Sequence, residues 1–295
     1  MTHGQGQGDN QGAPPSSGEG RRGGGGGAVG RLLDRLGRPV NRGLDYLGGL
    51  AVLIAEAIAW FWRSAIRREV RFGRPAFYAQ LVRLGLRSVL VVSLVSACIG
   101  FILAMQMAPP LEEFGQVDTV PNIIAIAVFR ELGPLIAAVV LTGFAGAAIA
   151  AELGTMVVGE EIEALEAHAL NPIRFLVLPR LLATAIAMVV VCLIGELMAI
   201  SAGWAIGVWV LDIPAWVYYH NTIEQLSVAD LLTGLWKAAF FGVLIASIAC
   251  YHGLRVTGGA AGVGRATTLT VVHSITAIIF SDLLFTSLFY ALGWH

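Results

Sequence analysis

The sequence is short of charged residues and holds a single lysine. Charged residues make up only 13% of the 295 residues and hydrophobic residues make up 56%. A typical soluble domain is about 25% charged, so this composition indicates an integral membrane protein. The net charge of −1 gives no basis for binding nucleic acid. Because Lys237 is followed by Ala238, the Gly-Lys-Ser/Thr of a P-loop is missing, and the chain does not hydrolyse ATP in that manner by itself.

Cysteine and histidine are also few, and neither shows the spacing of a metal site. The three cysteines, Cys98, Cys192 and Cys250, lie inside apolar runs and form no C-x-x-C pair. The six histidines contain no H-E-x-x-H pattern. We therefore expect no metal site and no cofactor bound by this chain.

Motifs of intramembrane enzymes are missing too. The sequence has no G-x-S-x-G, and Asp282 has no second intramembrane aspartate as a partner. An intramembrane lipid-modifying enzyme is therefore disfavoured. A non-transporting membrane scaffold is a second alternative, which only partner data would remove.

The first 80 residues divide into a tail and a basic apolar segment. Residues 1–30 are rich in Gly, Gln, Ser and Pro and contain no apolar h-region of a signal peptide, which predicts a disordered cytoplasmic tail. Within residues 31–80, Leu44 to Trp62 approaches the length of a membrane span. Its apolar residues form one stripe and arginines flank both of its ends, so we expect an amphipathic elbow helix in the plane of the cytoplasmic interface. A spanning helix is the alternative.

Residues 81–295 are predicted to form a domain of five transmembrane helices. The expected spans are Leu86–Met107 (ended by Pro109-Pro110), Pro121–Val157, Leu181–Val210, Leu231–Tyr251, and a last helix capped by Thr267 or Thr268 that ends near Leu292. The loops after the first and third spans lack lysine and arginine, whereas the loops after the second and fourth contain arginines. The predicted fold is therefore an all-α integral membrane protein with its N-terminus inside and its C-terminus outside.

The second span carries the strongest candidates for a functional site. Its length of about 55 Å exceeds the hydrocarbon core of about 30 Å, so it must be kinked, tilted or protruding. Arg130 and Glu131 stand next to each other, and Gly133-Pro134 follows, where proline removes one helical hydrogen bond. Arg130, Glu131 and Pro134 are therefore candidates for a polar site that binds a lipid head group. An ion pair at the membrane interface without such a role is an equal alternative.

Small residues form two rows further along this span. One row is Gly143, Ala147 and Ala151, and the other, offset by three residues, is Gly146, Ala150 and Gly154. Together they make one flat helix face on which another helix backbone can approach closely in lipid. We interpret this face as a helix-packing or dimer contact, within one subunit or between two.

A short acidic amphipathic segment, Glu160 to Leu170, follows the second span. Its candidate contact residues are Glu160, Glu161, Ile162, Leu165 and Glu166. An anionic cytoplasmic leaflet repels an acidic helix, so the groove of a partner protein is the favoured target. The alternative is a solvated loop helix with no partner.

Four further charged residues in or near apolar runs receive structural interpretations. Glu152, Glu196 and Asp282 are expected to cap a helix or to bond a neighbouring residue. Lys237, next to Trp236 near the outer end of the fourth span, is interpreted as an anchor at the membrane interface.

Several motifs then point to one family. FRELGP, AAELGTM and EEIEALEAHALNPIRFLVLPR lie between Phe129 and Arg180, and YHGLRVTGGAAGVGRATT covers Tyr251 to Thr268. These segments resemble the MlaE/YrbE family, the permease subunits of MCE-associated lipid ABC transporters, and the resemblance runs from about Gly30 to the C-terminus. It implies a homodimer in the inner (cytoplasmic) membrane that moves phospholipid or a related lipid. Two ATPase subunits would use ATP on the cytoplasmic face, and an MCE-domain protein would lie outside.

The resemblance also assigns roles within the chain. It implies that the lipid lies near Glu131 between two copies, and that residues 159–172 form the coupling helix that docks on the ATPase. The sequence departs from the family pattern at Phe144 and Val157, which stand where basic residues are common, and at Gly159 and Glu161, which replace threonine and glutamine. These departures bear on head-group preference and coupling. The sequence does not fix the identity of the lipid, the direction of transport or the identity of the partner subunits.

Overall fold

The computed structural model describes residues 28–65 and 74–293, and every regular element in them is a helix. The α-helices are α1 (Ala28–Ala65), α2 (Arg74–Glu113), α3 (Val120–Ala127), α4 (Gly133–Leu141), α5 (Ala147–Val158), α6 (Glu161–Ala167), α7 (Leu178–Trp209), α8 (Ala215–Gln225), α9 (Val228–Gly253) and α10 (Gly259–Ala291). A 3₁₀ turn, η1 (Val117–Thr119), and three π-helical turns, η2 (Val128–Leu132), η3 (Thr142–Gly146) and η4 (Ile173–Val177), connect some of them. Residues 1–27, which make up most of the predicted tail, lie outside the described residues.

Six stretches within these helices are long and apolar enough to cross a membrane. They are Gly43–Arg63, Phe77–Glu113, Val117–Val158, Ile173–Trp209, Val228–Gly253 and Gly259–Ala291. The prediction of an all-α, multi-pass membrane protein is therefore confirmed. The first stretch contains the predicted elbow helix, and its length and composition alone do not separate an in-plane helix from a spanning one.

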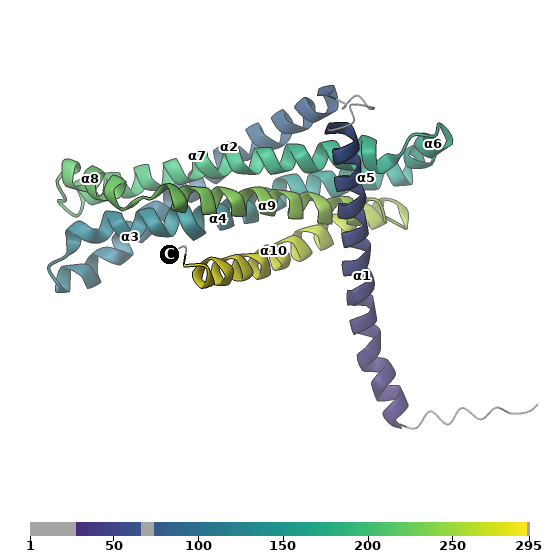
Figure 1. Cartoon of the computed structure of the whole chain (residues 1–295), viewed down its shortest axis with the longest axis horizontal. Coiled ribbons are helices and arrows are strands. Elements are labelled where there is room, and N and C mark those ends of the chain that lie inside the picture. Colours follow the sequence, from purple (N-terminus) through teal and green to yellow (C-terminus); the bar gives the residue numbers. More distant parts are fainter. Residues whose placement is uncertain (1–27, 66–73, 294–295) are drawn as a thin grey trace, which may run out of the picture. The chain divides into compact units, whose positions relative to one another are not determined.

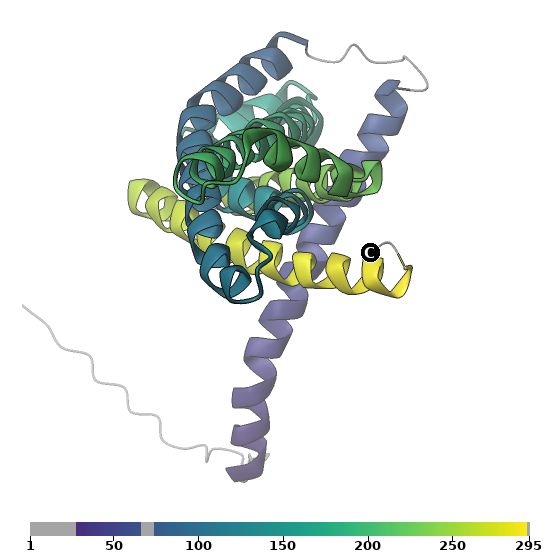
Figure 2. The same cartoon turned by 90° about the vertical axis from the view of Figure 1, so that its left-hand side faces the viewer.

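The chain divides into two compact units, Met1–Tyr46 and Leu47–His295, and the long bundle belongs to the second. In this bundle α7 packs along both α2 and α9, while α10 packs against α5 and α9. The short helices α8 and α6 lie at opposite ends of the bundle, which we call the α8 end and the α6 end (Figure 1). Viewed from the α8 end, α2 and α10 lie on different sides of the central helices (Figure 2).

A cluster of buried apolar side chains closes the α8 end. Ile124, Val128 and Ile206 are among its buried members, and Tyr218 of α8 packs into it with 1% of its surface exposed. This burial raises the pKa of the Tyr218 phenol well above its usual value, because the charged form would lose its water. The cluster therefore fixes α8, a helix outside the six apolar stretches, onto the bundle.

The same cluster explains why the predicted end of the first span is wrong. Pro109 and Pro110 lie inside α2, which continues to Glu113. Each proline removes a helical hydrogen bond, but Met107 and Leu111, on either side of the pair, both pack against the buried cluster. Tertiary packing therefore keeps this part of α2 helical through both prolines.

The predicted second span is one helical rod with irregular turns. The elements α3, η2, α4, η3 and α5 follow one another without a break from Val120 to Val158. At η2 the Gly133 N–H donates to the Val128 carbonyl, five residues back, directly before Pro134. Pro134 has no N–H to donate, and in the π-helical turn before it the hydrogen bonds reach one residue further back than in an α-helix. The irregularity predicted at Gly133-Pro134 is therefore confirmed.

The start of the last helix differs from the prediction. α10 begins at Gly259, eight residues before Thr267, so neither Thr267 nor Thr268 is its cap. Both hydroxyls instead donate to the Gly264 carbonyl. Gly258 has φ of 87°, a left-handed value that glycine adopts at little cost, and the chain turns into the helix there.

Candidate functional site

A cluster of charged side chains joins three elements near the α8 end. Lys237 of α9 contacts Glu131 of η2, with 2.8 Å between Nζ and Oε2, and Asp282 of α10, with 3.0 Å between Nζ and Oδ1. Lys237 Nζ also donates to Thr286 Oγ1 at 2.9 Å, and Thr286 Oγ1 donates to Glu131 Oε1 at 2.8 Å. We call these four residues the lysine cluster. They tie the π-helical turn to both α9 and α10.

The interpretation of Lys237 as an anchor at the membrane interface is therefore wrong. Its side chain is only 1% exposed and lies between two carboxylates, so the ammonium does not reach the bundle surface. A buried ammonium requires such partners, because its transfer out of water is costly. The signal in the sequence was the single lysine inside an apolar span, where an ionisable residue usually has a partner.

Arg130 and Glu131 do not pair with each other. Neighbouring residues of a helix point in different directions, and Arg130 Nε donates to Asp230 Oδ1 at the start of α9. Asp230 Oδ2 also accepts from the backbone N–H and the hydroxyl of Ser227, at 2.9 and 2.8 Å. The Asp230 N–H donates to Ser227 Oγ at 3.2 Å, which completes a capping box. Asp230 was not among the predicted site residues, although the spacing Ser-x-x-Asp before an apolar run is the signature of such a cap.

A close backbone contact brings these ion pairs together. Gly234 of α9 lies so near the π-helical turn that a Cβ atom placed on it would be 2.1 Å from the Phe129 carbonyl oxygen. The same atom would lie 3.5 Å from Pro134 Cγ. Pro134 is buried and shapes the contact between η2, α4 and α9.

Glu196 of α7 supports the π-helical turn from the other side. It is 1% exposed, and its Oε1 accepts a hydrogen bond from Cys192 Sγ at 3.1 Å. A Cβ atom on Gly133 would lie 2.6 Å from Glu196 Cγ, so the two helices leave no space between them. Glycine at position 133 is therefore needed for this approach.

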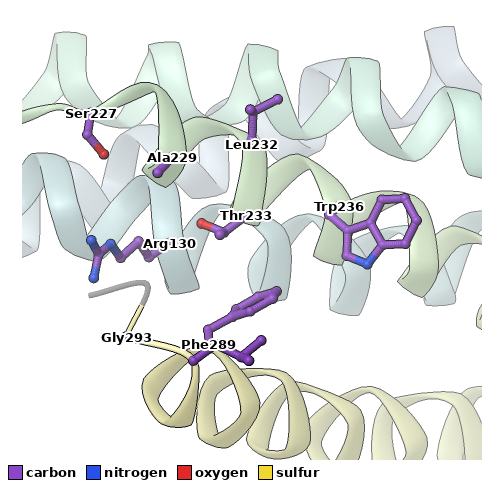
Figure 3. A pocket seen from close by; sticks show the side chains of 9 residues that line it. Arg130, Ser227, Ala229, Leu232, Thr233, Trp236, Phe289 and Gly293 are labelled. Atoms are coloured by element: carbon purple, nitrogen blue, oxygen red, sulfur yellow. The ribbon is translucent and has the colours of Figure 1, made fainter.

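A cavity of about 760 Å³ opens beside Arg130. Its lining comes from η2, α9 and the end of α10: Arg130, Ser227, Ala229, Leu232, Thr233, Trp236, Phe289, Leu292 and Gly293 (Figure 3). Arg130 and Trp236 lie toward opposite ends of the cavity, with Phe289 between them on the α10 side (Figure 3). The volume lies in the range of small-molecule sites, and the lining combines one guanidinium with apolar walls.

A smaller cavity of about 100 Å³ borders both this wall and the lysine cluster. Arg130 and Thr233 line both cavities, and Glu131, Lys237 and Thr286 line only the smaller one. The structure thus brings the predicted residues Arg130 and Glu131 to one polar region. It adds Asp230, Lys237, Asp282 and Thr286 to them.

The predicted coupling residues lie at the other end of the bundle. Glu160, Glu161 and Glu166 are exposed, whereas Ile162 and Leu165 are half-buried. The regular helix α6 is shorter than predicted, and left-handed residues flank it: Glu160 and Ala169 both have φ of 57°. The Leu170 N–H donates to the Leu165 carbonyl at 3.0 Å and closes the segment.

The two predicted rows of small residues have different surroundings. Gly146, Ala150 and Gly154 are buried; a Cβ atom on Gly146 would lie 3.3 Å from Ile245 of α9 and 3.5 Å from Thr270 of α10. Gly143 is exposed, with no atom within 4 Å of such a Cβ, and Ala147 and Ala151 are half-buried. The row of Gly146, Ala150 and Gly154 therefore packs inside the chain. The row that begins at Gly143 leaves a small-residue face open there.

These features define a multi-pass helical membrane protein with a polar cavity at one end of its bundle and an exposed acidic helix at the other. The family model described as permease MlaE matches residues 77–288, and the chain belongs to this family of ABC transporter permeases. The resemblance found in the sequence motifs is confirmed.

Relatives from distant organisms agree with this assignment. A probable ABC transporter permease protein of Rickettsia felis is 37% identical over 249 residues, which cover 83% of this chain and 96% of that protein. The intermembrane phospholipid transport system permease protein MlaE of Haemophilus influenzae is 31% identical over 228 residues, which cover 76% of this chain and 87% of that protein. A probable ABC transporter permease of Synechocystis is 32% identical over 212 residues, which cover 72% and 81%.

Proposed function

We propose that this permease moves phospholipid or a related lipid between the inner (cytoplasmic) membrane and an MCE-domain protein outside. A separate ATPase subunit supplies the energy, since the sequence has no P-loop lysine. One observation carries the proposal: a cavity with apolar walls and an arginine opens beside a cluster of paired charges around the buried Lys237. The H. influenzae relative is named as a phospholipid transport permease, which supports the same substrate class.

The cavity suits an amphiphile with an anionic head group. Arg130 Nε donates to Asp230, but 29% of the Arg130 side chain remains exposed, and a guanidinium has five donors in all. A phosphate is a preferred partner for these donors. Leu232, Trp236 and Phe289 offer apolar surface to the acyl chains. The neighbouring lysine cluster holds Glu131 in place and sets the field that the head group meets.

Glu131→Gln tests this site. The substitution removes one of the two carboxylates that face Lys237, so the field beside the cavity changes while Asp282 still pairs with the ammonium. We expect phospholipid transfer from proteoliposomes to fall about tenfold, which corresponds to about 1.4 kcal/mol. Folding and ATPase assembly should survive.

The matched control is Glu224→Gln on α8, where the carboxylate is 72% exposed. Photo-crosslinking from the position of Trp236 in the assembled complex adds an independent measurement, with lipid adducts expected. Full transfer activity of Glu131→Gln, together with adducts only to protein, would return Glu131 to the role of a structural ion pair.

The contacts of Leu47–Ala65 support the in-plane elbow helix. Gly49 lies against Tyr251 and Arg255, and the Arg174 guanidinium lies 5.7 Å from the centre of the Trp60 ring. Gly49 and Trp60 are about 16 Å apart along a helix, yet Tyr251, Arg255 and Arg174 all belong to a helix terminus, a loop or a π-helical turn at the α6 end. If this helix ran parallel to the bundle, Gly49 and Trp60 would contact the other helices at levels about 16 Å apart. We therefore propose that this segment crosses the α6 end, and that the arginine-containing loops place that end on the cytoplasmic side.

The α6 helix is proposed to transmit ATPase movements to the bundle. It is an exposed cytoplasmic projection, and half-buried Ile162 and Leu165 offer apolar contacts to a groove. Leu165→Asp should weaken co-purification of the ATPase about tenfold or more, because a desolvated charge would lie in the interface. Membrane insertion should be unchanged, and exposed Glu163→Gln is the control. Wild-type co-purification and wild-type stimulated ATPase activity of Leu165→Asp would refute the assignment.

The open row at Gly143 is the proposed contact between two copies of the chain. A leucine at Gly143 finds open space within one chain, so the variant should fold but lose the dimer if two backbones meet there. Gly146→Leu is the contrasting variant, because its side chain would collide with Ile245 and Thr270 and should lower stability by about 1–3 kcal/mol. Mass measurement of the purified complex distinguishes these outcomes. A Gly143→Leu protein that remains dimeric would place the dimer contact elsewhere.

A further inference from the structure

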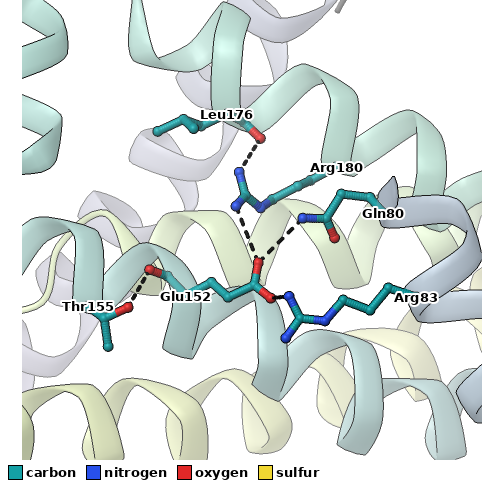
Figure 4. A network of polar contacts seen from close by, with 6 residues as sticks. All are labelled: Gln80, Arg83, Glu152, Thr155, Leu176 and Arg180. Carbon is teal, nitrogen blue, oxygen red and sulfur yellow. Dashed lines mark hydrogen bonds and ion pairs between the residues drawn. The ribbon is translucent and has the colours of Figure 1, made fainter. Parts of the chain in front are cut away.

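A second polar site lies near the α6 end, on different helices. Glu152 of α5 pairs with Arg83 of α2 through Oε1 and with Arg180 of α7 through Oε2, the latter at 3.3 Å (Figure 4). Gln80 Nε2 donates to the same Oε2 at 3.4 Å. Three donors from two helices therefore already occupy the two oxygens of this carboxylate.

The positive charge of this site exceeds its negative charge. Two guanidiniums face one carboxylate, and within the described part of the chain neither arginine has a second acidic partner. Arg180 is 8% exposed; its Nη1 donates to the Leu176 carbonyl at 2.9 Å, but its buried Nε has no hydrogen-bond partner. A buried, unpaired donor of a cation is costly. The site therefore has an excess positive charge and one unsatisfied hydrogen-bond donor, both of which an anion would stabilise.

An apolar groove on α2 includes one of these two arginines, Arg83. Tyr78, Ala79, Val82, Arg83 and Leu86 line an open groove of about 620 Å³ along α2. Arg83 is the one charged residue of this lining, and its side chain is 47% exposed. A groove with apolar walls that ends at a guanidinium fits a molecule with an acyl chain and an anionic head.

The depth of the site also fits a lipid head group. Glu152 follows Glu131 by 21 residues on the same helical rod, which is about 30 Å at 1.5 Å per residue. That distance is about the thickness of the hydrocarbon core. The Glu152 site and the lysine cluster therefore belong to opposite membrane boundaries, so a lipid at Glu152 comes from the other leaflet than one in the cavity beside Arg130.

We propose that Arg83 and Arg180 bind the phosphate of one anionic phospholipid from the leaflet at the α6 end, with an acyl chain in the α2 groove. Glu152 already accepts three hydrogen bonds and neutralises only one of the two guanidiniums, so a head group with a net negative charge balances the site better than a zwitterionic one. Phosphatidylglycerol has such a charge, whereas phosphatidylcholine and phosphatidylethanolamine do not. This bound lipid is distinct from the transported one, and it joins α2 to α5 and α7 next to α6.

Native mass spectrometry of the full chain with its assembled partners tests the proposal without any transport assay. We expect phosphatidylglycerol to bind at least about tenfold more tightly than phosphatidylcholine. Arg83→Gln should remove that preference, and because Arg83 is half exposed the variant should still fold. Arg265→Gln, which removes another arginine of the α6 end, is the control and should keep the preference. Equal binding of the two lipids, or a preference that survives in Arg83→Gln, would overturn the proposal.

Glu152→Gln separates lipid binding from a purely structural network. Removing the carboxylate leaves two guanidiniums without an anion, so phosphatidylglycerol should bind more tightly and should raise the melting temperature more than in the wild type. A network that only joins helices predicts the opposite: lower stability that phosphatidylglycerol and phosphatidylcholine restore equally. That second result would overturn the proposal even if transport by the complex were normal.

Discussion

We expect Lys237→Met to lower the free energy of unfolding by about 3 kcal/mol and to abolish transport. The variant leaves Glu131 and Asp282 facing each other without the ammonium that lies between them. Breaking a buried ion pair by removing one partner costs about 3–5 kcal/mol. The lower figure applies because the Glu131 side chain is 38% exposed and water reduces the cost of its charge. Unfolding of the purified protein in lipid nanodiscs, followed by intrinsic fluorescence, measures the loss.

A double variant provides the control for this prediction. Asp282→Asn in the Lys237→Met background removes the second negative charge, so part of the lost stability should return. Methionine keeps most of the apolar stem of lysine, so a loss of packing does not explain the change. If Lys237→Met unfolds like the wild type, the lysine cluster does not stabilise the bundle.

The position of the polar site along the chain was predictable because its cause is local. Proline at position 134 removes a hydrogen bond wherever the helix packs, so an irregular turn next to Arg130 and Glu131 follows from the sequence. The partners of these two residues were not predictable in the same way. Lys237 is 106 residues from Glu131, and only the packing of α9 and α10 on η2 decides which polar residues meet.

The helix boundaries show the same division between local and tertiary causes. Pro109-Pro110 and the glycine-rich stretch before Thr267 are breaking signals in isolation, yet α2 and α10 continue through them. In α10 the small residues allow close packing: Gly262 and Ala266 are buried, and Val263 lies against Gly154 of α5. Packing against neighbouring helices therefore overrides the intrinsic tendency of proline and glycine to end a helix.

The two rows of small residues show where a sequence pattern reaches its limit. Four-residue spacing identified a helix face suited to close contact, and the structure places Gly146, Ala150 and Gly154 against other helices of the same chain. The spacing of Gly143, Ala147 and Ala151 is identical, yet Gly143 is exposed. The pattern describes only one surface of a contact, so it does not tell which helix, or which copy of the chain, supplies the other.

Gly234→Ala should be as damaging as the loss of Lys237, although it changes no charge. The added methyl group would lie 2.1 Å from the Phe129 carbonyl oxygen, and a backbone atom of a helical turn cannot move aside as a side chain does. Overpacking costs about 1–3 kcal/mol, and we expect the upper end here because the obstacle is backbone. Alanine is otherwise favoured over glycine in a helix by about 1 kcal/mol, so a loss of stability would oppose the intrinsic preference.

The same substitution should also disrupt the polar site. Asp230, Gly234 and Lys237 follow the spacing i, i+4 and i+7, so they share the face of α9 that meets the π-helical turn. A methyl group that separates these two elements lengthens both the Arg130–Asp230 and the Glu131–Lys237 ion pairs. The transport rate per folded molecule should therefore also fall, in addition to the loss of folded protein caused by lower stability. Gly264→Ala in α10 is the matched control, because its methyl group meets no atom within 4 Å, so it should keep or slightly raise stability and leave transport unchanged. A Gly234→Ala protein that folds and transports like the wild type would show that α9 does not touch the turn that carries Arg130 and Glu131.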